Sequence, residues 1–572
     1  MKIRKMKMYM SWNVWLLLTW VVSTLGYRGA IDMPLSRELK SRDKKEIVLI
    51  KWGYDREMQE ISIEIQTPVA PWVALGLSPD GNMSTTDFVV GGWNKSNQPF
   101  FHDAHIEGEW PPVKDKTQDY ELLELSHNAS HVVMRVWRKW FTCDSNDAEI
   151  ENDTVRVIIV LGENHDFTFS EDRAYRRPMF LLEPIIEMVF PDDVRTYDFK
   201  LNDFLIPDHD TTYACAFIPM PNVSTKHHII RYEPINDPDS DEIVHHILIY
   251  GCGNSIDFSP EVGDCYGSDP RYAKCMNSMF GWAIGGEPID YPRQMGIPIG
   301  VEDAPQFVRI EIHYSNFENK PGILDSSGIR VYYTAQLREH DGGVLMTGIF
   351  TFPAQFIPPA SKLFRNYGLC NTGLIPEMLG HPTPDFTIYS YLLHGHLTVR
   401  GMRVLQYRNG TYIGTLVEDK KYDFRFQQAR HLPGTMQVKI GDQLVVECVA
   451  STLDRETVTY GGPSTLNEMC VTFLFYHPVV PIAACWSLAD IEHVSAAMEL
   501  DETENIMDAI VNINGVEWDD EQRAIAQRAI FEANHTAILT HREGWMINET
   551  CPLPHIVLPA PHPCPEDLED EH

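Results

Sequence analysis

Seven histidines occur in strand-like segments, at spacings that could bring several imidazoles to one metal ion. They are His227 and His228 in KHHII, His245 and His246 in VHHILIYGC, His313 in EIHYSN, and His394 and His396 in LLHGHLTV. Side chains alternate between the two faces of a strand, so a His-x-His pair presents both rings on one face and can bind one metal. Imidazole suits Zn, Cu, Fe or Ni, so the spacing identifies no particular metal. A single histidine is more often a hydrogen-bonded core or surface residue, and the pairs therefore carry the prediction.

The two adjacent pairs, His227–His228 and His245–His246, pose a geometric question. Neighbouring residues on a regular strand point to opposite faces. Both rings of such a pair reach one metal only if the backbone bulges, or if the two rings use different nitrogens. Spacing alone gives the two pairs equal weight.

Met469 is the other side chain with suitable chemistry, and it lies in LNEMCVTF beside Cys470. A thioether is a soft, weak ligand that favours Cu(I) when it is combined with imidazoles. The chain contains 22 methionines, however, and most methionines pack in cores. Composition therefore cannot single out Met469 and only its surroundings can.

The elements that would position these residues are predicted to be strands. Residues 45–160 contain EIVLIKWGYD and EISIEIQTP, whose apolar residues alternate with a period of two. Strand patterns return over 196–335 and 340–500, after a connector rich in proline and charge at 161–195. Residues 517–534 have helical character, and the chain after Cys551 is acidic and rich in proline. The sequence therefore predicts an all-β protein of sandwich type, with a helical and acidic tail over 501–572.

Length and charge restrict the class of protein. The chain has 572 residues, which is typical of about three to four domains. It carries 47 basic against 81 acidic residues, a formal charge of −34. Binding to nucleic acid or to an anionic membrane needs a basic surface, so this balance argues against both. Hydrophobic residues make up 44% of the chain, which is enough for well-packed cores.

The N-terminus and the sequons indicate export. Residues 1–26 combine a basic start, an apolar stretch over about 12–22 and small residues near Gly26, which predicts a signal peptide. No later segment is long and apolar enough to span a membrane. Eight asparagines begin Asn-x-Ser/Thr triplets, which predicts glycosylation: Asn82, Asn94, Asn128, Asn152, Asn222, Asn409, Asn534 and Asn548. Cysteines of exported proteins are usually paired, and 11 is an odd number, so at least one is left over.

Several long segments together resemble one family. TTYACAFIPMPNVSTKHHIIRYEPI and VHHILIYGC, followed in order by HYSN, LLHGHL and TVTYGGPSTLNEMCVTF, resemble the copper type II ascorbate-dependent monooxygenases, most closely their DBH-like branch. PWVALGLSPDGNMSTTDFVVGGW resembles a DOMON domain. The resemblance implies a DOMON β-sandwich at 45–160, followed by two jelly-roll-like copper sandwiches at 196–335 and 340–500.

The resemblance also implies the roles of the histidines and of Met469. It assigns His245, His246 and His313 to an electron-transfer copper, and His394, His396 and Met469 to an oxygen-binding copper. The pair His227–His228 falls on a family segment that does not bind metal. Tyr213 and His394 match positions with catalytic roles. In the family, ascorbate supplies two electrons one at a time, and one atom of O₂ enters a C–H bond while the other becomes water.

Further implications concern the cysteines and the DOMON domain. The resemblance pairs Cys215 with Cys265, Cys252 with Cys275, Cys448 with Cys470, Cys143 with Cys551 and Cys370 with Cys485. Cys564 is then left over, or it competes for one of these partners, such as Cys143. No cysteine lies at 486–550, where dopamine β-monooxygenase has cysteines that join subunits. A covalent dimer by that route is therefore not expected, and a non-covalent homo-oligomer is the alternative. Asp87 and Asp119 match metal-binding positions of a related DOMON domain, although surface or turn-capping aspartates are an equally good interpretation.

Departures from the family bear on the substrate. Val471 and Phe473 replace the Asn and Tyr with which peptide-amidating members hold a peptide carboxylate, so a peptide substrate is disfavoured. Phe473 also differs from the catecholamine enzyme, and Gly395 replaces the more usual Thr between the two histidines. The expectation is hydroxylation of a small, arylalkylamine-like substrate. The alternative is a binding or chaperone-like secretory protein that keeps the fold without turnover.

Overall fold

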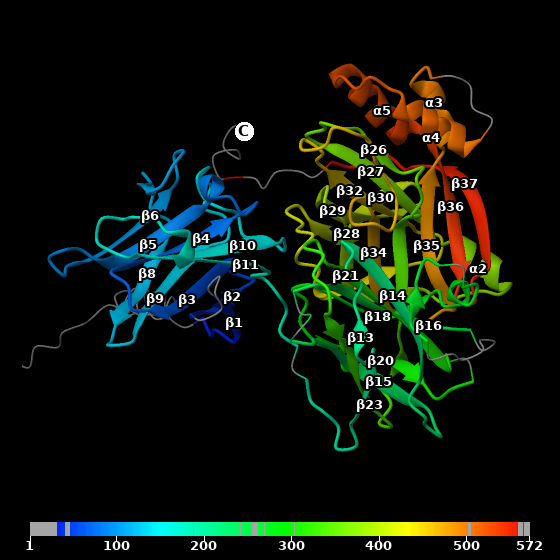
Figure 1. Cartoon of the computed structure of the whole chain (residues 1–572), viewed down its shortest axis with the longest axis horizontal. Helices are drawn as coiled ribbons and strands as arrows, with labels where there is room; N and C mark the ends of the chain where they lie inside the picture. Colours follow the sequence, from blue (N-terminus) through cyan, green and yellow to red (C-terminus); the bar gives the residue numbers. More distant parts are fainter. Residues whose placement is uncertain are drawn as a thin grey trace, which may run out of the picture. The chain divides into compact units, whose positions relative to one another are not determined.

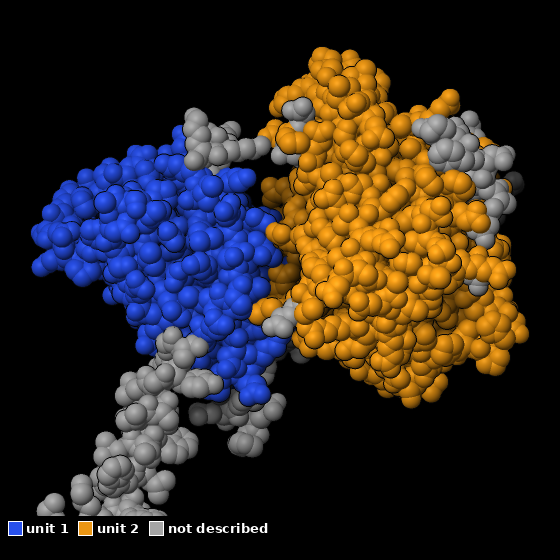
Figure 2. Space-filling view, turned by 90° about the horizontal axis from the view of Figure 1, so that it is seen from below, with its two compact units in different colours: residues 1–182, 562–572 blue, residues 183–561 orange. Residues whose placement is uncertain are grey.

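The computed structural model describes residues 31–40, 46–186, 188–238, 240, 242–253, 261–267, 269–302, 304–500, 505–558 and 564. The expected signal peptide at 1–26 lies outside these residues. The chain forms two compact units, residues 1–182 with 562–572 and residues 183–561 (Figures 1 and 2). None of the described helices is long and apolar enough to cross a membrane.

The first unit is a sandwich of two antiparallel sheets. One sheet has the order β1 (Leu35–Lys40), β2 (Ile47–Asp55), β3 (Glu60–Pro68), β9 (His131–Lys139), β8 (Glu121–His127). The other has the order β11 (Ala174–Met179), β10 (Val155–Leu161), β4 (Trp72–Ser78), β5 (Asp87–Trp93), β6 (Pro99–His105), β7 (Val113–Lys114). The alternating residues of β2 and β3 fill the core between the sheets, as their period of two predicts. β1 and β11 extend this sandwich beyond the expected range of 45–160.

The second unit begins with a sandwich that carries the first group of histidines. One sheet has the order β12 (Arg195–Lys200), β23 (Gly328–Thr334), β15 (His227–Ile235), β20 (Met295–Ile299), β24 (His340–Asp341), with β19 (Ile289–Asp290) paired to β15. The facing sheet has the order β17 (Gly263–Asp264), β14 (Thr211–Pro219), β21 (Phe307–Ser315), β16 (Val244–Gly251), β18 (Asn277–Ala283). A two-stranded ribbon joins β13 (Phe204–Leu205) to β22 (Leu324–Asp325).

A second sandwich follows within the same unit. Its larger sheet has the order β31 (Arg430–Val438), β28 (Phe386–Gly395), β34 (Cys470–His477), β25 (Gly343–Ile349), β35 (Ile482–Ala489), β36 (Asn534–His541), β37 (Met546–Pro552). Its smaller sheet has the order β27 (Phe364–Asn371), β32 (Gln443–Ala450), β29 (Val399–Arg408), β30 (Thr411–Asp419). Short β26 (Phe356–Ile357) and β33 (Thr459–Tyr460) also pair. Both sandwiches of this unit are jelly-roll-like, as the resemblance implies.

The tail differs from the expectation of helix followed by irregular chain. The predicted helix at 517–534 is present as α5 (Asp520–Glu532), which packs against β27 beside α3 (Ile491–Ala497) and α4 (Ile506–Asn514). The short α2 (Leu374–Leu379) follows β27. After α5, however, β36 and β37 extend the larger sheet beyond β35. These strands were not predicted from the sequence. β36 pairs with β35 across the intervening helices, and β37 joins the sheet only through β36.

The disulfides agree with the implied pairing with one exception. Four bonds join the implied partners, Cys215–Cys265, Cys252–Cys275, Cys370–Cys485 and Cys448–Cys470. Cys143, however, bonds Cys564 rather than Cys551, and Cys551 is a free thiol. Cys551 pairs with His535 across β36 and β37, which fixes it in the sheet of the second unit. The implied bond Cys143–Cys551 is therefore wrong. Five disulfides are consistent with a secreted or secretory-pathway protein.

Candidate metal centre

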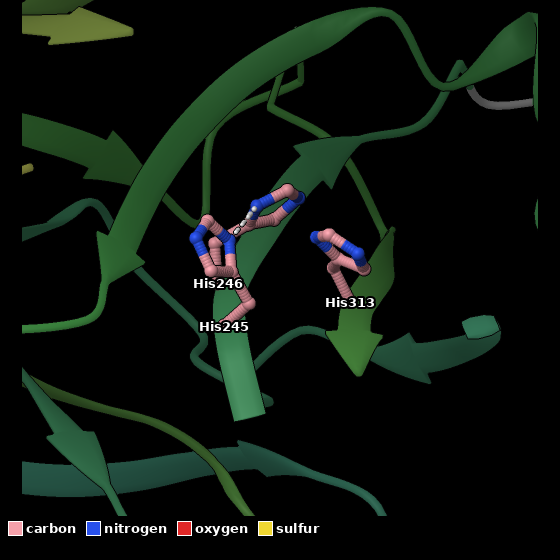
Figure 3. A group of neighbouring side chains, drawn as sticks. All are labelled: His245, His246 and His313. Carbon is pink, nitrogen blue, oxygen red and sulfur yellow. Dashed lines mark hydrogen bonds between the residues drawn. The ribbon is translucent and has the colours of Figure 1, made fainter. Parts of the chain in front are cut away.

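Three histidines converge on one face of the sheet that contains β16 and β21. His245 and His246 come from β16, and His313 comes from the neighbouring β21, opposite His246 (Figure 3). The pairing of the two strands shifts register between Val244 and His246, so β16 bulges at His245. The bulge lets both adjacent rings approach His313, and one nitrogen of each of the three rings lies within 4.8 Å of the others.

The nitrogens of this cluster have the character of metal ligands. Nδ1 of His245 lies 3.2 Å from Nδ1 of His246, and Nε2 of His245 and Nδ1 of His313 are buried without a hydrogen-bond partner. Burial lowers the pKa of His245 to about 3 and that of His313 to about 2, so these rings are neutral at pH 7. Neutral rings offer free lone pairs, and a shared metal ion would satisfy them. The cluster therefore fits the copper that the resemblance implies.

Aromatic rings hold two of these imidazoles in place. Tyr213 on β14 stacks on His313 with ring centres 4.3 Å apart, and Phe424 stacks on His245 at 4.4 Å. The Tyr213 hydroxyl donates a hydrogen bond of 2.5 Å to the carbonyl of Pro463, in the segment that leads to Met469. Burial, assisted by the charge of Glu311, raises the pKa of Tyr213 above its usual range, so the hydroxyl keeps its proton. Tyr213 thus links the three-histidine cluster to the loop of the second sandwich.

His394, His396 and Met469 form the second cluster. His394 lies near the end of β28, His396 follows that strand directly, and Met469 immediately precedes β34. Nε2 of His394 is 3.3 Å from Sδ of Met469, and the ring centres of the two histidines are 5.4 Å apart. The disulfide Cys448–Cys470 ties the start of β34 to β32. The structure therefore brings the three expected residues together, although only His394 lies within the strand.

Hydrogen bonds fix the rings of this second cluster. Oε1 of Gln427 lies 2.7 Å from Nδ1 of His394, and the carbonyl of Asn467 lies 3.2 Å from Nδ1 of His396. Both contacts favour a proton on Nδ1, which leaves Nε2 free as a ligand atom. Burial lowers the pKa of both histidines to about 4. The softer donor set of two imidazoles and a thioether fits a copper ion.

Glu468 holds the loop around this cluster. Its buried carboxylate accepts hydrogen bonds from the backbone N–H of His396, from both N–H and hydroxyl of Thr398, and from the N–H of Met469. Burial raises the pKa of Glu468 although these four hydrogen bonds lower it. Neither Glu468 nor Gln427 was predicted from the sequence. Glu468 could have been suspected because it directly precedes the candidate ligand Met469. Nothing in the sequence around Gln427 indicates a contact with His394.

The pair His227–His228 has a structural role. Nε2 of His228 lies 2.8 Å from a carboxylate oxygen of Asp341, and its Nδ1 accepts a hydrogen bond from the backbone of Arg338. Nδ1 of His227 contacts the carbonyl of Thr225 at 2.8 Å. Both nitrogens of His228 are therefore occupied, and the pair does not join either cluster.

The two clusters meet in the second unit beside an apolar cavity, which one histidine of each cluster lines. The ring centres of His246 and His394 are 5.8 Å apart, and both residues line the cavity. The space between its atoms is about 430 Å³, including the part open to solvent. It adjoins both groups of candidate ligands, which is where a small molecule would meet a bound metal.

Carboxylates gather around the two aspartates expected in the first unit. Oxygens of Asp87, Asp103 and Asp147 lie within 4.8 Å of one another, and so do those of Asp119, Asp144 and Asp147. Asp147 thus connects the two expected residues, and Arg138 forms an ion pair of 2.7 Å with Asp87. Burial and neighbouring carboxylates raise the pKa of Asp103 to about 8 and that of Asp147 to about 7. One oxygen of Asp87 and both oxygens of Asp147 are buried without a hydrogen-bond partner, which suits a cation.

Comparisons with known proteins agree with this architecture. The family profile of the copper type II ascorbate-dependent monooxygenase N-terminal domain matches residues 197–321, that of the C-terminal domain matches 340–498, and that of the DOMON domain matches 44–162. The chain belongs to the copper type II ascorbate-dependent monooxygenase family.

Its relatives include DBH-like monooxygenases. The chain is 39% identical to DBH-like monooxygenase protein 2 of Mus musculus, over 97% of this chain and 90% of that protein. It is 43% identical to the putative DBH-like monooxygenase protein 2 of Homo sapiens, over 81% of this chain and 93% of that protein. It is 31% identical to dopamine beta-hydroxylase of Rattus norvegicus, over 78% of this chain and 73% of that protein.

Proposed function

We propose that this protein is a copper- and ascorbate-dependent monooxygenase that hydroxylates a C–H bond of a small molecule with O₂. The observation that carries the proposal is that two ligand sets, one of three imidazoles and one of two imidazoles and a thioether, lie beside one apolar cavity, which one histidine of each set lines. A protein that only bound ligands would not need two different donor sets that meet at the same cavity.

The reaction balances when ascorbate supplies both electrons. A substrate R–H reacts with O₂, two electrons and two protons to give R–OH and water. Copper bound at the two clusters supplies one-electron redox chemistry and a site for O₂. The imidazoles are neutral because they are buried, so no proton competes with the metal for their lone pairs. The apolar walls of the cavity keep water away from the reacting C–H bond.

The catalytic roles expected of His394 and Tyr213 are part of this proposal. His394 lines the cavity, so it is placed beside the substrate. The Tyr213 hydroxyl is instead hydrogen-bonded to Pro463, and its ring covers His313. These contacts favour a positioning role for Tyr213. The apolar lining of the cavity supports a small substrate with an apolar ring, such as the arylalkyl group of the expected substrate.

The test uses Met469→Ala with Met507→Ala as a matched control, because Met507 lies on an exposed face of α4. Met469→Ala should abolish ascorbate-dependent hydroxylation and keep copper at the three-histidine cluster. The control should retain both the activity and the full copper content. Two bound coppers and full turnover in Met469→Ala would contradict the proposal.

The carboxylate cluster around Asp147 is proposed to bind a divalent cation in the DOMON domain. A cation would bind the oxygens of Asp87 and Asp147 that accept no hydrogen bond, beside the ion pair that Arg138 forms with both residues, and would offset the repulsion between the carboxylates. Calcium should therefore raise the melting temperature of the protein, and Asp147→Asn should remove most of that rise. An equal rise in both proteins would contradict this site.

We also propose that the protein acts in the lumen of the secretory pathway or outside the cell, and that it is glycosylated. All eight asparagines of the Asn-x-Ser/Thr triplets are exposed in the structure, as attachment of a glycan requires. Removal of N-glycans by a glycosidase should lower the apparent mass of the protein expressed in a eukaryotic host. An unchanged mass would contradict the glycosylation.

A further inference from the structure

The cavity that His246 and His394 line has apolar walls from both sandwiches of the second unit. On the first side, strand pairing places Leu248 opposite Gly281 and His246 opposite Ala283, so these residues share one face of their sheet. On the second side, Leu392 pairs with Phe473, and Val344 pairs with Phe475. All eight residues line the cavity. Apart from His246, each wall residue named here presents only apolar atoms to an occupant.

The few polar side chains that line the cavity are uncharged, and most of them already form hydrogen bonds or are candidate metal ligands. Gln427 uses its oxygen for His394, and its amide nitrogen donates to the carbonyl of Phe424 at 2.9 Å. His246 and His394 are the candidate metal ligands. Ser278 remains as the source of one hydroxyl group. Trp282 also lines the cavity, and its indole N–H donates to the carbonyl of Gly286 at 2.9 Å. Besides the ligands, Ser278 is therefore the described lining side chain whose neutral polar group is left for an occupant.

Among the residues that the structure describes around the cavity, none of those lining it is an Asp, Glu, Lys or Arg. The carboxylate of Glu311 lies on the same face of the sheet, because Glu311 pairs with Leu248, but it does not line the cavity. It is also neutralised by Arg309, whose Nη2 is 3.2 Å away. A protonated amine would lose its hydration in this cavity without gaining a counter-charge, which costs several kcal/mol per ion. A carboxylate would also lose its hydration, and only bound copper could offset part of its charge.

We propose that the substrate is a compact, uncharged, apolar molecule of the alkylbenzene type, and not an arylalkylammonium ion or an arylalkanoate. This inference rests on the proposed function, because it assumes that the molecule in this cavity is the one that is hydroxylated. Apolar contacts with Leu392, Phe473 and Phe475 hold the ring, and Ser278 can accommodate one neutral polar substituent. The expected arylalkylamine is thus narrowed to an uncharged analogue of similar size.

The first experiment compares three ligands of similar size, n-propylbenzene, 2-phenylethylamine and phenylacetate. Binding to the copper-loaded, ascorbate-reduced full chain is measured by calorimetry at pH 7 without O₂, and products are then measured by mass spectrometry in air. Propylbenzene should bind at least about tenfold more tightly than either ion. A tenfold difference in affinity corresponds to about 1.4 kcal/mol of binding free energy. Equal or tighter binding of an ion, or no binding of propylbenzene, would overturn the inference.

The two measurements separate failure of the inference from failure of the proposed function. Binding of propylbenzene without any hydroxylated product would refute the monooxygenase and leave the charge selectivity standing. Hydroxylation of phenylethylamine in preference to propylbenzene would refute the selectivity and leave the monooxygenase standing.

A pair of variants at Leu248 tests the cause of the selectivity. Leu248→Glu places a carboxylate in the wall, and Leu248→Gln has nearly the same size without the charge. The Glu variant should improve binding of 2-phenylethylamine at least about tenfold relative to the Gln variant, because it supplies the missing counter-charge. Equal binding of the amine by both variants would contradict the electrostatic argument. If either variant fails to fold, the comparison of the three ligands on the native chain still tests the proposed preference for an uncharged substrate.

Discussion

The two candidate copper sites differ in how their ligands are held. At the three-histidine site, two buried ring nitrogens have no hydrogen-bond partner, and aromatic rings stack on His245 and His313. At the His–His–Met site, Gln427 and Asn467 contact the Nδ1 atoms, and Glu468 fixes the backbone on both sides. The first site is thus positioned by sheet geometry and stacking, and the second by hydrogen bonds to loop residues.

This difference follows from where the ligands lie. All three histidines of the first site belong to paired strands, whose backbone is already fixed by the ladder. His396 and Met469 lie just outside strands, where the backbone needs other partners. Hydrogen bonds from a buried carboxylate supply them. We therefore expect substitutions of polar residues to damage the second site while sparing the first.

The largest effect is expected for Glu468→Ala. The substitution leaves the N–H groups of His396, Thr398 and Met469 without their acceptor, and each unsatisfied buried group costs ~1–3 kcal/mol. The variant should lose several kcal/mol of stability and the copper of the His–His–Met site, as measured by thermal unfolding and metal analysis. Glu468→Gln keeps one oxygen as an acceptor, so its stability and copper content should lie between those of the native protein and Glu468→Ala. Unchanged stability with two coppers bound would show that the loop is held by other contacts.

A smaller and more selective effect is expected for Gln427→Leu. The variant removes the acceptor that holds the proton on Nδ1 of His394, and loss of such a partner typically weakens metal binding by ~10–100-fold. The three-histidine site should keep its affinity. Gln428→Leu is the matched control, because Gln428 is hydrogen-bonded to Glu183 instead. An equal loss at both sites, or the same loss in the control, would remove the proposed difference between the sites.

The smallest effect is expected for Tyr213→Phe. Phenylalanine keeps the ring that stacks on His313 but loses the hydrogen bond to Pro463, which is worth about 1 kcal/mol. Copper should remain at the three-histidine site, and turnover should fall only a few-fold. Tyr213→Leu, which also removes the stacking, should weaken copper binding there. Abolished turnover in the Phe variant with full copper content would show instead that the hydroxyl takes part in catalysis.

The sequence predicted the sandwiches and the ligand types better than their surroundings. Alternation of apolar residues is a local signal, and it correctly placed strands such as β2 and β3. Spacing could not separate His245–His246 from His227–His228, because the difference lies in distant partners. His228 is occupied by Asp341 and the backbone of Arg338, whereas β16 bulges at His245. Only the family resemblance separated the two pairs.

Long-range features were beyond the reach of sequence patterns. Gln427 is 33 residues from His394 in the chain, and nothing near it indicates a contact. Cys143 had two candidate partners near the C-terminus, and the choice of Cys564 follows from the pairing of Cys551 within β37. Such features depend on tertiary contacts rather than on local periodicity.

The central claim is that two different ligand sets bind copper, and X-ray absorption at the copper edge tests it most directly. The reduced, copper-loaded protein should show sulfur scattering from part of its copper together with scattering from imidazole nitrogens. In Met469→Ala the sulfur contribution should disappear while the imidazole contribution remains. Absence of sulfur scattering in the native protein, or its persistence in Met469→Ala, would contradict the account.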